Sequence, residues 1–377
     1  MIPNQRHLFD IPSDITYLNC SSYSPLLKQV YEAGQRGLER KYHSWNINPA
    51  VLDEEAEILR GLFASLIGAP ANDIAIIPST AYGAATAAAN LPLGSGRKVI
   101  VLEDQFPSNV YCWRELAKDR EANLITIARP DDWDWTPAVL AEIDDETDIV
   151  SLPHNHWIEG SRLDLVAIGK QCRNKGAAFV VDATQSVGAM VLDISEIQPD
   201  YLICSAYKWL LCPYTLAFLY VAPKHQHGRP LEQHRKNHGP DETPGGNLEY
   251  SKDFTAGARR FDMGERGNFI NLPMAIAALT QLNAWGPAAI QETLTALTDF
   301  AADEAAQRGW RMPEKNKRVG HYIGITPPTP LADDTIAKLE NEKIYLTRRG
   351  KGLRISPHLF NDKQDIERLF AALDGLA

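Results

Sequence analysis

Short apolar runs alternate with amphipathic stretches along most of the chain. Seven runs rich in Val, Ile and Leu are bounded by turn residues and have the length of buried strands; they cover residues 73–77, 98–102, 124–127, 148–152, 178–181, 201–204 and 216–221. Near-continuous apolar strands separated by helices are typical of parallel strands that are buried on both faces. The pattern therefore predicts an α/β fold in which a mostly parallel seven-stranded sheet lies between helices.

The same pattern predicts the helices and a smaller unit. Apolar residues recur at helical spacing in residues 51–67, 84–91, 109–120, 137–143, 164–175, 274–285 and 287–308. Residues 321–376 then show a strand–helix–strand–strand–helix succession, which predicts a small C-terminal α+β domain. We expect residues 22–258 to form the large domain, and residues 1–21 together with 259–377 to form the small one. The polar residues 226–255, rich in His, Pro and Gly, are typical of a long functional or connecting loop.

Composition narrows the class of protein. The formal net charge of −10 argues against nucleic-acid binding, which needs a basic face. No apolar run approaches the roughly 20 residues of a membrane span, and the first residues lack the pattern of a secretory signal. The five cysteines are dispersed and odd in number, which favours reduced thiols in a cytoplasmic protein. His225, His227, His234 and His238 match no standard zinc spacing, so no metal site is predicted.

Two strand ends carry candidate chemistry. Asp182 ends the strand over 178–181, and Lys208 follows the strand over 201–204 within an apolar segment. Ligands of such sheets bind beyond the carboxyl ends of the strands. An acid and a desolvated amine at these ends suit pyridoxal 5′-phosphate (PLP), since the acid keeps the ring nitrogen protonated and the amine forms a Schiff base. Alternatively, Asp182 caps a helix and Lys208 points into water.

Three further positions fit the same cofactor, each with an ordinary alternative. Residues 79–83 open a helix directly after a strand, so their backbone N–H groups could bind a phosphate or simply form a capped helix start. Phe106 could stack on an aromatic cofactor or belong to the core. Arg354 lies in the middle of a strand, where it would bind a substrate carboxylate or form an internal ion pair.

These segments together resemble the class V aminotransferase family of fold type I PLP enzymes, which includes cysteine desulfurases, kynureninases and isopenicillin N epimerase. The most specific matches are Asp-Ala-Thr-Gln-Ser-Val-Gly at 182–188, Ser-Ala-Tyr-Lys-Trp-Leu at 205–210 and Leu-Arg-Ile-Ser-Pro-His at 353–358. The resemblance implies that Lys208 carries the cofactor, that Asp182 pairs with the pyridinium and that Arg354 holds the substrate carboxylate. It also implies that Gln185 contacts the ring oxygen, that Phe106 stacks on the ring, that Thr80, Ala81, Ser205 and Tyr207 hold the phosphate, and that Trp157 lies near the substrate.

The resemblance also implies an amino-acid substrate and a homodimer, in which residues 260–268, including Glu265 and Asn268, approach the partner subunit's phosphate site. Residues 346–352 contain no cysteine where desulfurases carry a persulfide cysteine, so sulfur transfer through an enzyme persulfide is not expected. Amino transfer is the first expected reaction. β-Elimination by a Cβ–S lyase, epimerisation and a non-catalytic binding role are the alternatives.

Overall fold

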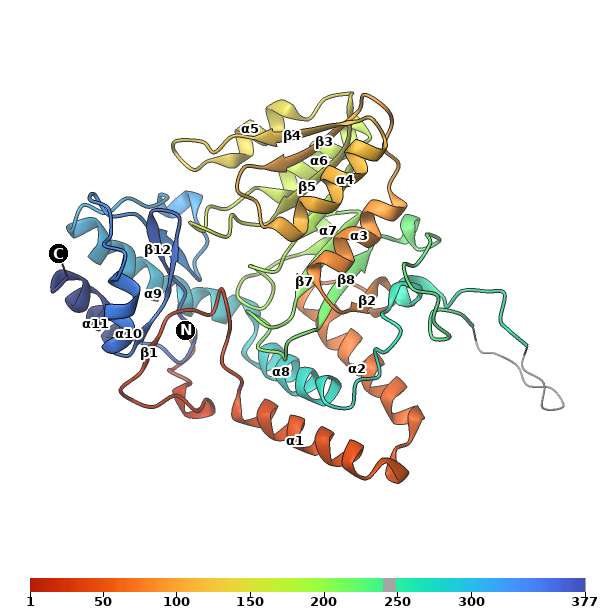
Figure 1. Ribbon diagram of the computed structural model, residues 1–377, viewed down its shortest axis with the longest axis horizontal. Helices are drawn as coiled ribbons and strands as arrows, with labels where there is room; N and C mark the ends of the chain where they lie inside the picture. Colours follow the sequence, from red (N-terminus) through yellow and green to blue (C-terminus); the bar gives the residue numbers. More distant parts are fainter. Residues whose placement is uncertain (240–248, 377) are drawn as a thin grey trace.

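Seven strands form one central sheet in the computed structural model, which describes residues 1–239 and 249–376 (Figure 1). The strand order is β2-β8-β7-β6-β5-β3-β4. The strands are β2 (Ile74–Ile77), β3 (Lys98–Leu102), β4 (Asn123–Ile127), β5 (Thr147–Pro153), β6 (Ala178–Asp182), β7 (Tyr201–Ser205) and β8 (Ala217–Val221). Neighbouring strands run parallel except β8, which is antiparallel to both β2 and β7. The predicted mostly parallel seven-stranded sheet is confirmed.

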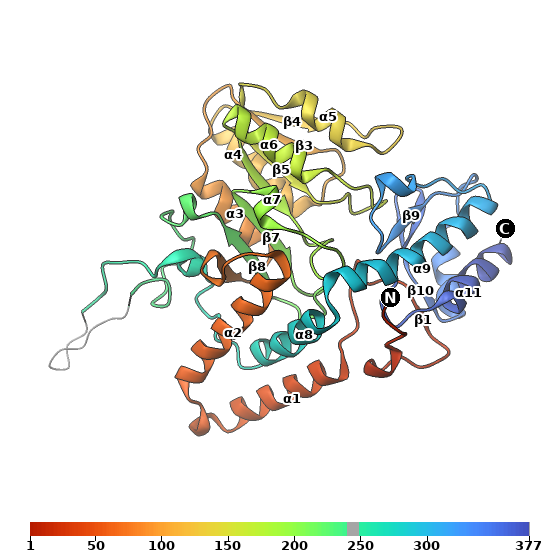
Figure 2. The same cartoon turned by 180° about the vertical axis from the view of Figure 1, so that it is seen from behind.

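Helices cover both faces of this sheet (Figures 1 and 2). The helices are α1 (Lys28–Tyr42), α2 (Pro49–Ile67), α3 (Thr80–Asn90), α4 (Tyr111–Asp119), α5 (Trp135–Glu142), α6 (Leu165–Lys175), α7 (Ile194–Ile197), α8 (Asn271–Trp285), α9 (Pro287–Gln307), α10 (Thr335–Asn341) and α11 (Lys363–Asp374). Because side chains alternate across a strand, Ile74 and Ile76 pack in one core with α2, α5, α6 and α8. Ala75 and Ile77 pack in a second core with α3 and α4. Burial on both faces explains why the strands are apolar throughout.

The alanine-rich helix α3 lies unusually close to the sheet. A Cβ atom at Gly83 would lie 2.8 Å from a side-chain carbon of Ile203 on β7, so only a glycine fits at this crossing. Residues 79–83 form the start of this helix, since Ser79 caps it by accepting a hydrogen bond from the Tyr82 amide at 3.2 Å. The helix therefore begins at Thr80, four residues earlier than the pattern predicts, and its N-terminus points to the carboxyl-end side of the sheet.

A third core joins the two ends of the chain. β9 (Ile323–Ile325), β11 (Thr347–Arg349) and β12 (Gly352–Ile355) form a three-stranded sheet, and β1 (Thr16–Tyr17) pairs in parallel with β10 (Ile344–Tyr345). The second strand of the succession predicted over 321–376 is therefore divided: residues 344–345 pair with the N-terminal segment, and residues 347–349 pair with β12. The proposed domain boundaries stay a prediction. They assign α8 to the small domain, but α8 packs on α1 and α2.

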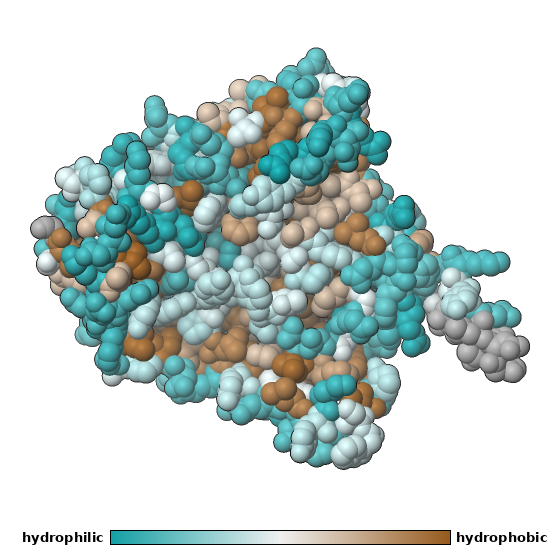
Figure 3. All heavy atoms as spheres, in the orientation of Figure 1, coloured by the Kyte–Doolittle hydropathy of each residue, from teal (hydrophilic) through white to brown (hydrophobic). Residues whose placement is uncertain are grey.

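Part of the predicted loop over 226–255 lies outside the described residues, namely 240–248. Just before this loop, His225 Nε2 lies 2.6 Å from Asp200 Oδ1, and within its described part a β-bridge joins His238 to Phe254. The surface in Figure 3 is mostly hydrophilic, with hydrophobic patches along the edge where α1 and α8 lie. In the described ranges, every helix is too short or too polar to cross a membrane.

Candidate active site

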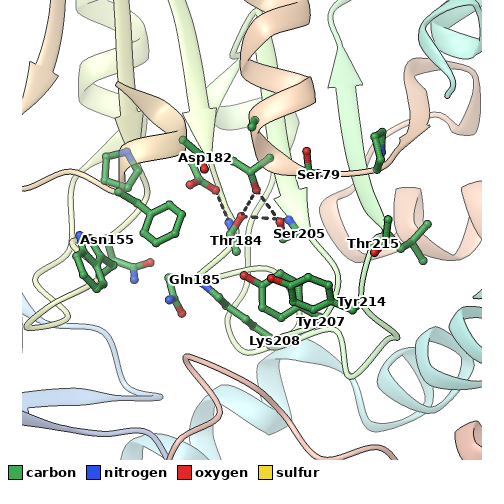
Figure 4. Close-up of a pocket in the computed structure, with 18 residues that line it drawn as sticks. Ser79, Asn155, Asp182, Thr184, Gln185, Ser205, Tyr207, Lys208, Tyr214 and Thr215 are labelled. Carbon is green, nitrogen blue, oxygen red and sulfur yellow. Dashed lines mark hydrogen bonds between the residues drawn. The ribbon is translucent and has the colours of Figure 1, made fainter. Parts of the chain in front are cut away.

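A cavity of about 400 Å³ opens at the carboxyl ends of β5, β6 and β7, next to the N-terminus of α3 (Figure 4). Its walls are Pro78, Ser79, Thr80, Ala81, Phe106, Ser108, Pro153, Asn155, Trp157, Asp182, Thr184, Gln185, Ser205, Tyr207, Lys208, Tyr214, Thr215 and Leu216. Every residue predicted for a cofactor or substrate site is among them except Arg354. Segments that are distant in the sequence thus meet at the carboxyl ends of neighbouring strands, as expected for a sheet of this kind.

Lys208 is buried in the wall of this cavity, with 7% of the residue exposed. Burial, and after it the positive charge of Arg354, lower the pKa of its amine to about 8, against the opposing effect of Asp182. The Nζ atom lies 5.3 Å from the centre of the Phe106 ring and 5.6 Å from that of Tyr207. The alternative of a lysine pointing into water is therefore wrong. A substantial fraction of this amine is neutral near pH 8, as a nucleophile or a base requires.

The carboxylate of Asp182 is held by two donors at the end of β6. Its Oδ1 accepts a hydrogen bond from the Thr184 amide at 2.9 Å, and its Oδ2 accepts one from Asn109 Nδ2. Asn109 is buried and ends the short helical turn Pro107–Asn109. These two bonds fix the orientation of a carboxylate that lines the cavity, and Asn109 is a contributor that the sequence pattern did not single out.

Three hydroxyl groups meet beneath the N-terminus of α3. Thr80 Oγ1 lies 2.6 Å from Ser205 Oγ and 3.3 Å from Thr184 Oγ1, which also accepts a hydrogen bond from the Ser205 amide at 3.1 Å (Figure 4). The first backbone N–H groups of a helix, here those of Thr80 and Ala81, have no acceptor within the helix. Free N–H groups, hydroxyls and the positive end of the helix dipole together make a site for an anionic group such as phosphate.

Aromatic rings form the rest of the wall. Phe106 is 37% exposed, so it is not a core residue, and it contacts the Trp157 ring edge-on at a centroid distance of 5.6 Å. Tyr207 packs against Tyr214, with ring centroids 4.4 Å apart, and against Tyr23 at 6.1 Å. Burial raises the pKa of the Tyr207 hydroxyl, which keeps it a neutral hydrogen-bond donor over the ordinary pH range. A flat aromatic ligand in the cavity can thus stack on the face of the Phe106 ring.

Gln185 lines the cavity with an amide that the protein already positions. Its Nε2 donates to the Ser21 carbonyl at 3.0 Å, and its Oε1 accepts from Trp209 Nε1 at 2.8 Å. One N–H of this amide is left for a ligand. Its predicted contact with a ring oxygen stays a prediction.

Arg354 lies just behind the cavity wall, with 1% of the residue exposed. Its Nη1 donates to the Trp157 carbonyl at 2.6 Å and its Nη2 to Ser22 Oγ at 2.8 Å, while its buried Nε has no partner. Within the described part of the chain no carboxylate lies within 4 Å of it, which contradicts the alternative of an internal ion pair. Burial lowers the pKa of this guanidinium to about 9.

The segment predicted to reach a partner subunit, residues 260–268, is buried at Phe261 and Asp262 and exposed at Glu265 and Asn268. The Glu265 side chain is 99% exposed and lies 3.8 Å from His234, and Asn268 accepts hydrogen bonds from the amides that begin α8. Its role toward a second subunit stays a prediction. The described residues hold no cluster of three or more His, Cys, Asp or Glu side chains arranged for a metal ion.

Several wall residues were missed from the sequence. Thr184 lies within the matching segment 182–188. Asn109, which holds Asp182 without lining the cavity itself, lies three residues after Phe106. Asn155 donates a hydrogen bond to the Tyr322 hydroxyl at 2.5 Å. That contact joins residues 167 positions apart, so no local pattern could have indicated it.

Fold and cavity together define an α/β protein with a buried amine, an oriented carboxylate and an anion site around one space. The chain belongs to the aminotransferase class-V family, whose family model matches residues 16–369. The predicted resemblance to this family is confirmed.

Curated relatives match most of this chain, and solved structures share its fold. The chain is 27% identical to the uncharacterized aminotransferase YcbU of Bacillus subtilis, over 100% of this chain and 98% of the relative. It is 27% identical to isopenicillin N epimerase of Streptomyces clavuligerus, over 87% and 85% of the two chains. Two structures of C-DES, one of a variant with glycine covalently linked to its PLP cofactor and one of this cystine C–S lyase with cysteine persulfide, have TM-scores of 0.88 and 0.87 at 19% identity. The first covers 99% of this chain and 100% of C-DES, the second 97% and 98%, and both show that the fold is shared.

Proposed function

We propose that this protein is a PLP-dependent enzyme that acts on the α-carbon of an amino acid. The observation that carries the proposal is Lys208, a desolvated amine that shares one cavity with an oriented carboxylate and a helix N-terminus. A purely structural lysine gains nothing from such burial, since removing its charge from water is costly. Membership in the class-V family and the cofactor in the C-DES structure support the same conclusion.

The residues present fit PLP as a cofactor. The hydroxyls of Thr80 and Ser205 and the first amides of α3 would hold its phosphate, and Phe106 would cover one face of its ring. Asp182 would face the ring nitrogen, with Asn109 and the Thr184 amide keeping its carboxylate in place. When bound, PLP supplies a Schiff base and an electron-withdrawing ring that weakens bonds at the α-carbon of an amino acid.

The chain's own groups perform the proton chemistry. Lys208 Nζ would hold the cofactor, and as a free amine it would take the α-proton of the substrate, because its lowered pKa of about 8 leaves it partly neutral. Arg354 would bind the α-carboxylate, which would supply the counter-charge that the described residues do not. The neutral Tyr207 hydroxyl would donate toward the phosphate.

Amino transfer is the reaction we favour. Family membership and the full-length similarity to YcbU support it. All five cysteines are free, and none lines the cavity, so an enzyme-bound persulfide has no residue to form on. Those unpaired thiols also support our proposal of a cytoplasmic protein. A homodimer is part of the proposal too, supported by exposed apolar side chains on and after α1, namely Tyr31, Leu38, Tyr42 and Trp45.

A spectrum followed by product analysis tests this function. The protein reconstituted with PLP should absorb visible light, and Lys208→Ala should lose that band, whereas Lys118→Ala on the exposed side of α4 should keep it. A panel of amino acids with a 2-oxo acid acceptor is then scored for new oxo acid, for pyruvate with ammonia or sulfide, and for loss of optical rotation. Formation of the oxo acid together with the aminated acceptor establishes transfer, and the other two products establish a lyase or an epimerase. A colourless protein that cannot be reconstituted would refute the whole proposal and favour a non-catalytic role.

A further inference from the structure

Two arginines from adjacent strands converge on one hydroxyl beside the cavity. Arg354 on β12 donates to Ser22 Oγ at 2.8 Å, and Arg349 at the end of β11 donates to the same atom at 3.3 Å. Both guanidinium groups also lie over the Trp157 ring, at 5.9 and 5.2 Å from its centre. Trp157 lines the cavity, so the two positive charges lie together behind one part of its wall.

Neither guanidinium has a counter-ion among the residues that the structure describes. Every ion pair found in residues 1–239 and 249–376 leaves Arg349 and Arg354 out, and both have a buried Nε without a hydrogen-bond partner. Their acceptors are a hydroxyl and a carbonyl, both neutral. The buried Arg60 shows the ordinary solution in the same molecule, because Asp262 accepts two hydrogen bonds from it at 3.1 and 2.9 Å.

This arrangement is costly without an anion. A buried charge without a partner is destabilising, and two like charges at one hydroxyl add to that cost. Burial lowers the pKa of both Arg354 and Arg349, and the positive charge of Arg349 also lowers the pKa of Arg354. One carboxylate neutralises only one of the two cations. Two anionic groups are needed to balance both, and the charge-assisted bonds to each would be strong.

We propose that the substrate is a dianionic amino acid, whose α-carboxylate binds Arg354 and whose side-chain anion binds Arg349. This rests on the proposed function, since it places the α-carbon at Lys208. Arg354 is deeply buried and therefore suits the α-carboxylate, whose position is the same in every amino acid. Arg349 is half-buried and therefore suits the side-chain anion, whose position varies with side-chain length. A second carboxylate, a phosphate or a sulfonate shares the required chemistry.

The first experiment measures selectivity in the PLP-loaded protein. We expect kcat/KM for glutamate or aspartate to exceed that for glutamine or asparagine at least tenfold. Phosphoserine and cysteate are tested in the same way, to show whether the second anion is a carboxylate, a phosphate or a sulfonate. Arg349→Gln should reduce this acid-over-amide ratio at least tenfold. The matched control is Arg348→Gln, since Arg348 already lies 3.7 Å from Asp333 and should leave the ratio unchanged. Equal use of acids and amides by the unaltered protein would overturn the inference, as would an unchanged ratio in Arg349→Gln.

The second experiment does not depend on turnover, so it separates this inference from the proposed function. Calorimetry of the PLP-loaded protein with succinate and with butyrate should show at least tenfold tighter binding of succinate, and Arg349→Gln should remove the difference. Equal affinity for the two probes would overturn the inference even if the protein is an active aminotransferase. A preference for succinate in a protein that converts no amino acid would support the dianion site and refute the proposed reaction.

Discussion

Replacing Lys208 with methionine should stabilise the cofactor-free protein, and the gain should disappear as the pH rises. Methionine has a similar shape and no charge, so the substitution removes the buried amine without leaving a large void. The pKa of Lys208 is lowered from 10.5 to about 8, chiefly by burial, so the folded state holds its proton less tightly than the unfolded chain does. Protonated Lys208 therefore destabilises the fold.

The size of the effect follows from the two pKa values. At pH 7 the amine is charged in both states, and the full penalty is about 3 kcal/mol at 1.36 kcal/mol per pKa unit. Between about pH 8 and 10.5 the unfolded state binds more protons, so stability rises with pH, and near pH 9.5 only about 1 kcal/mol of penalty remains. With an unfolding entropy of roughly 2.1 cal/mol/K per residue over 377 residues, 3 kcal/mol corresponds to about 4 °C in Tm.

Thermal unfolding without PLP at pH 7, 8 and 9.5 measures this difference directly. Lys208→Met should unfold about 4 °C above the unaltered protein at pH 7 and within about 2 °C of it at pH 9.5. The exposed Lys118→Met is the matched control and should leave Tm nearly unchanged at each pH. A lower Tm for Lys208→Met, or a difference that does not change with pH, would show that burial of the charge is not what sets the amine's pKa.

Three other substitutions test how the fold holds the site. Asp262→Ala removes the fully buried carboxylate partner of Arg60, leaving only Glu57 at 3.3 Å, and should cost about 3 kcal/mol, seen as a lower Tm, while combining it with Arg60→Met should recover most of the loss. Asn109→Ala removes a charge-assisted donor from Asp182 and should weaken PLP binding about tenfold by equilibrium dialysis, with a smaller effect on cofactor-free stability; unchanged affinity would contradict the positioning role. Gly188→Ala places a methyl group 2.4 Å from a backbone carbonyl oxygen, at a residue whose φ is 97°. Its Tm should therefore lie below that of the control Lys118→Met, and equal Tm values would contradict the predicted clash.

The sequence predicted the sheet well because its signal is local. Strands buried on both faces need apolar residues throughout, and each such run contains its own evidence. The antiparallel direction of β8 depends on its pairing with β2 and β7, and the residues of β8 alone do not indicate that pairing. The division of residues 344–349 has the same origin, because the partner of β10 lies at the opposite end of the chain.

The candidate site shows the same limit. Lys208 and Asp182 could be identified because a strand end presents its next residues to the ligand side of the sheet. Whether Arg354 forms an ion pair could not be predicted, since an arginine with a carboxylate partner and one without look the same in the sequence. Only the structure shows that its acceptors are Ser22 and a carbonyl, and that Arg349 lies beside it.

The joining of the chain's two ends sets an order in which the protein can be completed during its synthesis. Thr16 donates a hydrogen bond to Asp365, 349 residues later, and Ser22 meets Arg354 across 332 residues. At a synthesis rate of about 5–20 residues per second, the N-terminal segment waits on the order of tens of seconds for these partners. The strand ends that carry Asp182 and Lys208 are made long before. The lysine side of the cavity can thus form on the nascent chain, whereas the arginine side forms only after residues 349–354 have left the ribosome.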